Sequence, residues 1–354
     1  MKLIIKNNKM KNLISKITVV VFVSLLIVSC KSNNEKESDK TQEVKENKTG
    51  QDLPNTFALK ELALHPEGII YSNSTKKTYV GSYFKGKIVT VDLEGKMNDF
   101  VTDDALVAVV GMAIDQTKNR LLVCNANSGL SQKSKKETIG SLAEIIAYDL
   151  TTGKKIKTIN LAGLHKGRHF LNDITTDGKG NAFVTDSFSP VIYKINTDDE
   201  LSVLASDKLF EVPQGAFGLN GIVYHNDNYL IVGSMGKLFK VSISSPKEVK
   251  EITLDKPINS LDGLLLVDGN TLALASNYFM GPKFDEAIYK IETTDNWATA
   301  KVTSVFKDLA GIFPTTLTKI NKDVYVSYGY FGDLVNPESK PNDNFKLQKV
   351  KFYN

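Results

Sequence analysis

Short apolar segments alternate with polar turns along most of the chain, from Phe57 to near the C-terminal end. The segments are rich in Val, Ile, Tyr and Phe, and residues such as Gly, Asn, Asp and Lys separate them. Runs of this kind, bounded by turn residues, are typical of β-strands and hairpins. The period of about 3.6 residues that indicates helices is missing almost everywhere, so the pattern predicts an all-β protein.

The segments recur in one order: an inner strand, a polar turn, a second strand, another turn and a third strand. This unit occurs six times, and the residues that open its inner strands are Glu67, Gly111, Asn172, Asn220, Asp262 and Thr315. Periods of about 40 to 50 residues with several short strands are typical of propeller blades. We therefore expect residues 55–354 to form a six-bladed β-propeller. A β-sandwich, which would not repeat the same internal order, is the less favoured alternative.

The stretch of residues 57–64 precedes the first repeat unit. A propeller must join its first and last blades to close the ring and protect its sheet edges. We expect this stretch to supply the outer strand of the last blade.

The N-terminal segment has the pattern of a secretory signal peptide. Five lysines precede the apolar run of residues 17–28, which is shorter than the about 20 residues that a membrane-spanning helix needs. The run leads into Ser29-Cys30, which resembles the lipobox of bacterial lipoproteins. The resemblance implies that residues 1–29 are cleaved and that Cys30 is lipidated, which anchors the protein to a bacterial membrane in the cell envelope. A plain secretory peptide with a chance cysteine is the alternative.

Residues 30–54 follow the predicted lipid site and consist mostly of Lys, Glu, Asn, Ser, Asp, Thr and Gln. A segment with so few apolar side chains cannot offset the entropy lost on ordering. We expect a flexible tether that holds the folded body away from the membrane.

The charge balance and the cysteines exclude several function classes. The net charge is +4, part of it from the N-terminal lysines, and no clustered basic segment with a nucleic-acid-binding motif occurs. We expect no nucleic-acid partner, and we expect a monomer. With Cys30 lipidated, Cys124 has no partner for a disulfide, and its strand-like surroundings predict a buried, inert thiol.

Side chains with oxygen donors open four of the six inner strands. They are Glu67, Asn172, Asn220 and Asp262. Radial repetition brings equivalent positions of successive blades together around one axis, so we expect these side chains to converge. Two carboxylates and two amides suit a hard cation such as Ca²⁺ or Mg²⁺. The alternative is that Asn-Asp, Asn-Gly and Asp-Gly are ordinary turn sequences, which leaves the coincidence in four blades unexplained.

A known family carries the same residues. The motifs are Pro66-Glu67-Gly68, Asn172-Asp173 followed by Gly180-Asn181 and Thr185-Asp186-Ser187, Asn220-Gly221, and Asp262-Gly263. In these motifs the chain resembles the SMP-30/gluconolactonase-like group of six-bladed propellers, which includes lactonases. The resemblance implies that Glu67, Asn172, Asn220 and Asp262 bind a divalent metal. Ca²⁺ is the expected ion, with Mg²⁺ or Zn²⁺ as alternatives.

The resemblance also implies hydrolysis of a small-molecule lactone or related ester, with the metal polarising the carbonyl. Asp262 is the expected general base. Because a carboxylate that touches a cation is a weak base, a metal-bound water or His169 is the alternative. The gluconolactonases usually place an arginine two residues before the Asn-Asp pair, whereas this chain has Phe170 there and Arg168 four residues before it. We expect Arg168 and Asp173 to contact the substrate.

One alternative to the hydrolase remains open at this point. Propellers commonly display interaction surfaces, and a fold does not fix a function. The chain is therefore either the expected metal-dependent hydrolase or a non-enzymatic ligand-binding or sensor propeller with a structural cation. No Gly-x-Ser-x-Gly elbow and no Cys-x-x-Cys or His-Glu-x-x-His pattern occurs, so serine hydrolases of the α/β type and the common zinc sites are not supported.

Overall fold

The structure is a computed structural model of the chain, and it describes residues 52–245, 248–278 and 283–352. The predicted signal peptide, the predicted lipid site at Cys30 and residues 31–51 of the predicted tether lie outside the described residues. Within the described ranges, no helix has the length and apolar character needed to cross a membrane.

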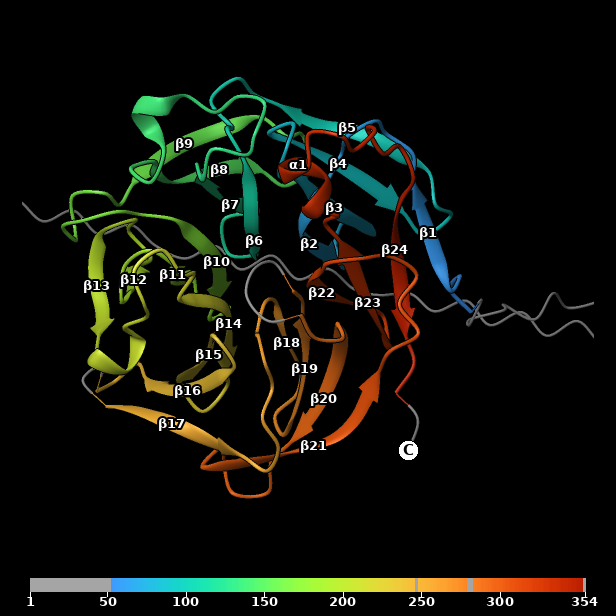
Figure 1. Ribbon diagram of the computed structural model, residues 1–354. Coiled ribbons are helices and arrows are strands. Elements are labelled where there is room, and N and C mark those ends of the chain that lie inside the picture. The colour runs from blue at the N-terminus through green and yellow to red at the C-terminus, as the bar shows by residue number, and fades with distance from the viewer. Residues whose placement is uncertain (1–51, 246–247, 279–282, 353–354) are drawn as a thin grey trace, which may run out of the picture. The chain divides into compact units, whose positions relative to one another are not determined.

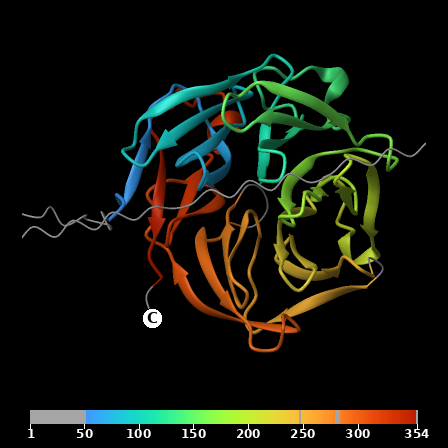
Figure 2. The ribbon, with the colours of Figure 1, turned by 180° about the vertical axis from the view of Figure 1, so that it is seen from behind.

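Six four-stranded antiparallel blades are arranged around a ring (Figure 1), and the view from behind shows the same arrangement (Figure 2). Two of the blades are joined into one eight-stranded sheet by the pairing of β17 with β21. The first strand of each blade faces the middle of the ring. These inner strands contact one another in the order β2, β6, β10, β14, β18 and β22, and β22 contacts β2 again. The predicted all-β, six-bladed propeller is confirmed.

The first three blades each consist of four consecutive strands. Blade 1 comprises β2 (Pro66–Ser72), β3 (Lys77–Ser82), β4 (Lys87–Asp92) and β5 (Met97–Thr102). Blade 2 comprises β6 (Val109–Asp115), β7 (Arg120–Ala126), β8 (Ala143–Asp149) and β9 (Lys155–Asn160). Blade 3 comprises β10 (Leu171–Thr176), β11 (Ala182–Asp186), β12 (Val191–Ile195) and β13 (Leu201–Ser206).

The other three blades follow the same plan, except that the last takes its outer strand from the N-terminal side. Blade 4 comprises β14 (Leu219–His225), β15 (Tyr229–Ser234), β16 (Lys237–Ser242) and β17 (Val249–Leu254). Blade 5 comprises β18 (Leu264–Asp268), β19 (Thr271–Ser276), β20 (Ala287–Glu292) and β21 (Thr299–Phe306). Blade 6 comprises β22 (Pro314–Ile320), β23 (Asp323–Tyr328), β24 (Phe345–Val350) and β1 (Thr56–Leu59). Single helical turns occur at η1 (Lys136–Thr138), η2 (Lys208–Phe210) and α1 (Gly332–Val335).

The ring is closed by β1, which pairs antiparallel with β24 from Thr56 opposite Gln348 to Leu59 opposite Phe345. This confirms the expected closure by the segment before the first repeat, although the strand is shorter than residues 57–64. The Tyr325 hydroxyl donates a hydrogen bond to the Pro54 carbonyl at 2.6 Å. The last residues of the predicted tether therefore lie against blade 6.

The apolar core lies between neighbouring blades rather than inside any one of them. Tyr79 and Ile88 of blade 1, for example, pack with Leu121 and Val123 of blade 2. Cys124 of β7 is fully buried in another of these layers, and burial raises the pKa of its thiol well above the usual value. The predicted buried thiol is confirmed.

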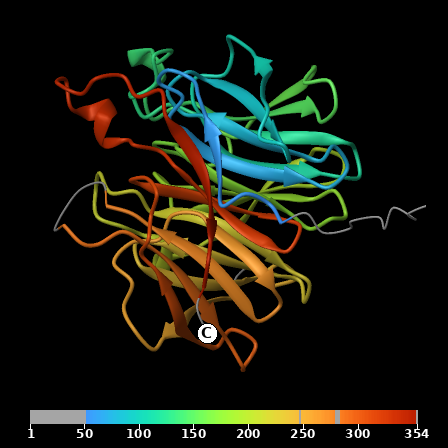
Figure 3. The same ribbon diagram turned by 90° about the vertical axis from the view of Figure 1, so that its right-hand side faces the viewer.

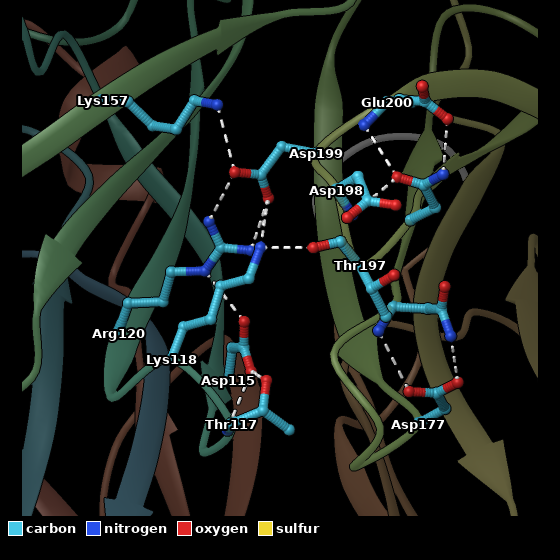
Figure 4. A network of polar contacts seen from close by, with 12 residues as sticks. Asp115, Thr117, Lys118, Arg120, Lys157, Asp177, Thr197, Asp198, Asp199 and Glu200 are labelled. Atoms are coloured by element: carbon cyan, nitrogen blue, oxygen red, sulfur yellow. Dashed lines mark hydrogen bonds and ion pairs between the residues drawn. The ribbon is translucent and has the colours of Figure 1, made fainter. Parts of the chain in front are cut away.

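Blades 2 and 3 are also joined by a network of ion pairs between strands β7 and β9 of blade 2 and the turn between β12 and β13 of blade 3 (Figure 4). The Arg120 guanidinium is almost completely buried and pairs with Asp115 at 2.8 Å in its own blade and with Asp199 at 2.7 Å in blade 3. Lys157 of β9 pairs with the same Asp199 at 3.0 Å. Asp199 therefore holds together cationic groups that belong to the neighbouring blade.

Candidate functional site

A cavity of about 700 Å³ is lined by residues from all six blades. All four predicted metal ligands, Glu67, Asn172, Asn220 and Asp262, line it. So does Phe331, which precedes α1, and the segment with α1 projects from one side of the ring (Figure 3). The structure thus brings together four side chains that are far apart in the sequence, at the end of the ring where the inner strands begin.

An irregularity in the inner strands places these side chains. Pro66 pairs with Ser82 and Ile69 pairs with Val80, so β2 has one residue more than β3 between the two pairs. This is a β-bulge, which disturbs the ladder and re-aims a side chain, and Glu67 lies in it. The same shift occurs in β10 around Asn172 and in β14 around Asn220. The bulge is therefore the local feature of the backbone that directs the side chains of Glu67, Asn172 and Asn220 toward the cavity.

The register corrects one position of the sequence analysis. In blade 2 the bulge falls between Val109 and Met112, so the residue equivalent to Glu67 is Val110 and not Gly111. Val110 lines the cavity. In blade 6 the equivalent residue, Thr315, donates its hydroxyl proton to the Glu67 carbonyl oxygen at 2.9 Å. At this position blade 2 therefore contributes an apolar side chain to the cavity, and blade 6 contributes a hydroxyl that holds the backbone of Glu67.

Glu67 is the most unusual side chain of the site. Only 5% of it is exposed, and its Oε2 atom has no hydrogen-bond partner among the described residues. Burial raises the pKa of Glu67 well above its ordinary value, and repulsion from Asp262 and Asp173 raises it further. A buried carboxylate oxygen without a partner is costly, so this atom fits a ligand to a cation.

Asp262 is held by amides of its own blade and the preceding one. The Asn277 side-chain nitrogen donates to the Asp262 carboxylate and also to the Pro314 carbonyl, the latter at 2.9 Å. Burial raises the pKa of Asp262 to about 7, although the Asn277 hydrogen bond lowers it, and a hydrogen bond from Asn220 also lowers it. The carboxylate is thus fixed in orientation and faces the cavity from blade 5.

Asn172 is oriented by a similar chain of hydrogen bonds. Its side-chain nitrogen donates to the Ser187 hydroxyl at 2.9 Å, and that hydroxyl donates to the Leu219 carbonyl at 2.5 Å. The amide nitrogen is therefore committed to the protein. The side-chain oxygen is the atom that remains for a ligand, and an amide oxygen is what a hard cation takes.

Asp173, predicted to contact the substrate, lies between blades 3 and 4. Its carboxylate accepts hydrogen bonds from the Ile174 amide at 2.8 Å and from the Ile222 amide of β14 at 3.1 Å. Burial raises the pKa of Asp173 to about 7 in spite of these bonds, which lower it. Asp173 is not among the described residues that line the cavity, and its geometry is that of a tie between inner strands.

His169 and Arg168 are also not among the described residues that line the cavity. His169 is buried, and its Nδ1 atom lies 2.8 Å from the Asp186 carboxylate. The hydrogen bond to Asp186 raises the pKa of His169, although burial opposes this. The Arg168 guanidinium is exposed and lies over the Phe188 ring at 4.6 Å. The structure thus does not bring either residue to the four predicted ligands.

The sequence analysis missed two groups of cavity residues. Asn277 follows the second strand of blade 5, and Tyr83 holds the same place in blade 1. The residue directly after the second strand lines the cavity in blades 1, 4 and 5, as Tyr83, Met235 and Asn277, so a comparison of these positions across the repeats is the signal that would have found them. The second group is aromatic and comes from the connections between strands, where the sequence analysis did not compare positions.

No family model matches the chain, and no curated protein matches it. Solved structures do resemble it. The major allergen Mala s 1 of Malassezia sympodialis has a TM-score of 0.66 and 18% identity over 85% of this chain and 97% of that chain. A luciferin-regenerating enzyme has a TM-score of 0.56 and 14% identity over 84% of this chain and 95% of its own. A gluconolactonase from Xanthomonas campestris has a TM-score of 0.55 and 13% identity over 84% of this chain and 89% of its own. At these identities the likeness shows the propeller fold, and the function must be argued from the site.

Proposed function

We propose that this protein hydrolyses a lactone or related ester with the help of a divalent cation held by Glu67, Asn172, Asn220 and Asp262. The observation that carries the proposal is the buried, unpartnered Glu67 oxygen in a cavity that also receives Asp262 and two amides. Ca²⁺ is the ion that this set of oxygen donors suits best, ahead of Mg²⁺ and Zn²⁺.

The donor set fits such an ion in charge as well as in chemistry. The Asp262 carboxylate lies close enough to Glu67 to raise the pKa of Glu67. The described residues that line the cavity include one cationic side chain, the exposed Lys283. When bound, a divalent cation would neutralise the two carboxylates and supply the charge that polarises an ester carbonyl.

The residues of the chain then have distinct roles. Asn277 donates a hydrogen bond to the Asp262 carboxylate, which accepts a proton from water in the proposed reaction. The water oxygen adds to the carbonyl carbon, the acyl carbon–oxygen bond breaks, and the leaving alkoxide takes up a proton to give a hydroxy acid or an acid and an alcohol. Asn172 and Asn220 would help to hold the cation, and as neutral amides they do not change charge during the reaction. The predicted lipid at Cys30 would place this reaction in the cell envelope.

The first test combines metal binding with turnover. We expect purified protein to bind about one Ca²⁺ per chain by calorimetry and to open lactones in a chelator-sensitive way. Glu67→Gln and Asp262→Asn should each weaken Ca²⁺ binding and lower kcat/KM by about 100-fold or more, because each removes a charged ligand from a site with few donors. The readouts are calorimetric titration and product formation.

Asp227→Asn is the matched control, since Asp227 is an exposed carboxylate on the turn between β14 and β15. It should leave both readouts unchanged. Full turnover in Asp262→Asn would refute the assignment of the site. Stabilisation by Ca²⁺ without turnover of any lactone or ester would instead favour a ligand-binding propeller with a structural cation.

A further inference from the structure

An arc of aromatic rings covers one side of the same cavity. Consecutive rings are in contact or close to it, with centroids 4.9 Å apart for Phe313 and Phe331, 4.8 Å for Phe331 and Tyr83, 6.5 Å for Tyr83 and Phe170, and 5.3 Å for Phe170 and Phe217. The five side chains all line the cavity and come from blade 6, blade 1 and the connections that lead into blades 3 and 4. We call these five residues the aromatic arc.

The aromatic arc is fixed in place by the rest of the protein. The Asp186 carboxylate accepts hydrogen bonds from the backbone amide of Phe170 at 2.8 Å and from that of Phe188 at 3.1 Å. The Phe188 ring packs against Phe170 and Phe217, with centroids 5.4 and 5.1 Å away. Phe170, Phe313 and Phe331 are each at most 8% exposed. A preformed apolar wall binds apolar groups without a cost for ordering its own side chains.

Most polar groups of the cavity lie where the inner strands begin, and the other polar side chains that line it outside the aromatic arc are Ser128, Asn259, Ser260 and Lys283. Asn277 is committed to Asp262, and Asn172 to Ser187. Among the described residues that line the cavity, none is an arginine, and the one lysine, Lys283, is exposed. A ligand rich in hydroxyl or carboxylate groups would lose its water without gaining partners along the arc. The cavity therefore suits a ligand with one polar end and an apolar body.

We propose that the substrate is a lactone or ester with an apolar substituent, such as an alkyl or aryl chain, that lies against the aromatic arc while its carbonyl lies at Glu67 and Asp262. The position of the carbonyl at Glu67 and Asp262 rests on the proposed function. The position of the apolar substituent rests on the aromatic arc alone. A cavity of about 700 Å³ has the size that is typical of sites for small organic ligands of this kind.

The test uses two series of compounds with the Ca²⁺-loaded protein. Turnover is measured with γ-butyrolactone, γ-hexalactone, γ-octalactone and γ-decalactone, and with glucono-δ-lactone as a polar comparison. Binding is measured by calorimetry with 2-alkylcyclopentanones, which have the ring and the carbonyl but cannot be hydrolysed. We expect kcat/KM and affinity to rise roughly fourfold for each added methylene until the arc is covered, and the sugar lactone to be the poorest substrate.

Phe217→Ala removes a half-buried ring of the arc. It should weaken binding of the longest ketone by roughly tenfold and make the rise with chain length shallower. Phe100→Ala is the matched control, because Phe100 is a partly buried ring of β5 that packs on Tyr79 and is not among the described residues lining the cavity. It should leave the dependence on chain length intact.

The two measurements separate the two proposals. Tighter ketone binding with chain length, lost in Phe217→Ala, supports an apolar ligand even if no lactone is hydrolysed, in which case only the proposed hydrolysis fails. Turnover that is flat along the lactone series, or best with glucono-δ-lactone, overturns the apolar substrate and leaves the hydrolase standing. Flat binding together with no turnover overturns both.

Discussion

Three buried carboxyl groups dominate the chemistry at the scale of single residues. Burial raises the pKa values of Glu67, Asp173 and Asp262, to about 7 for both aspartates. Repulsion from Asp262 and Asp173 raises the pKa of Glu67 further, and repulsion from Asp173 and Glu286 raises that of Asp262. Asp173 differs from the other two, because its oxygens are used by backbone amides. Glu67 and Asp262 are therefore the pair whose charge a bound cation would stabilise.

These shifts predict how stability depends on pH. A carboxyl group with a raised pKa holds its proton longer in the folded protein than in the unfolded chain, so the folded state binds more protons. The contribution to stability is complete below about pH 4 and is lost as the pH rises through about 7. Thermal unfolding of the metal-free protein should show a melting temperature that falls over this window. A rise would contradict the assignment of protonated carboxyl groups.

Added Ca²⁺ should act in the opposite direction, because the ion needs the ionised carboxylates and protons compete with it. At a Ca²⁺ concentration of 100 times the dissociation constant, we expect the melting temperature to increase by about 5 °C at pH 8 and by little at pH 5. Asp262→Asn should remove most of the increase at pH 8, whereas Asp227→Asn should not.

At the scale of elements, close approach of the inner strands determines where the site residues lie. A Cβ atom on Gly68 would lie 2.1 Å from the Val110 carbonyl oxygen, and one on Gly221 would lie 2.4 Å from the Asp262 carbonyl oxygen. Both glycines directly follow a predicted ligand. Their lack of a side chain lets β2 and β14 pack against the backbone of the next blade, which helps to bring the predicted ligands to one cavity.

Gly68→Ala tests this role. The added methyl group meets backbone rather than a movable side chain, so we expect a loss of about 2 to 3 kcal/mol in the free energy of unfolding, measured with urea. Gly163→Ala is the control, because no atom lies within 4 Å of the position that its Cβ would take. It should change the free energy of unfolding by less than about 0.5 kcal/mol. Equal stability of Gly68→Ala and the parent chain would show that the strands have room to separate.

At the scale of the whole propeller, neighbouring blades are held by more than their apolar layers. The pairing of β1 with β24 joins the start of the described chain to its last blade. Between blades 4 and 5, the outer strands β17 and β21 pair in parallel at Thr253 and Leu254. Between blades 2 and 3, the link is the ion network around Arg120, which is nearly excluded from solvent (Figure 4).

Asp199→Ala measures the contribution of that network. It leaves the buried Arg120 with Asp115 as its remaining carboxylate in the network, so we expect a loss of about 3 kcal/mol in the free energy of unfolding. Lys157→Ala removes a more exposed partner of the same carboxylate and should cost less than about 1 kcal/mol. Similar losses in the two variants, by urea unfolding, would show that burial of Arg120 does not decide the effect.

Much of the fold could be predicted because each blade repeats the same alternation. The three inner strands of most blades have buried apolar positions, which the sequence displays directly. Apart from β1, the fourth strands were missed because they are mostly exposed, as in Lys155–Asn160, where one residue of six is buried. A strand that contacts water on most of its surface carries little hydrophobic pattern.

The sequence by itself determined the all-β repeat and the four oxygen-bearing residues, because both follow from the equivalence of positions in successive blades. Only the tertiary structure decided that Val110, not Gly111, belongs to that set, because a bulge shifts the register by one residue. Only the tertiary structure brought Asn277 to Asp262 and the aromatic arc to the cavity. These residues lie on the connections next to the strands, and their positions in space are set when the closed ring brings the ends of all six blades together.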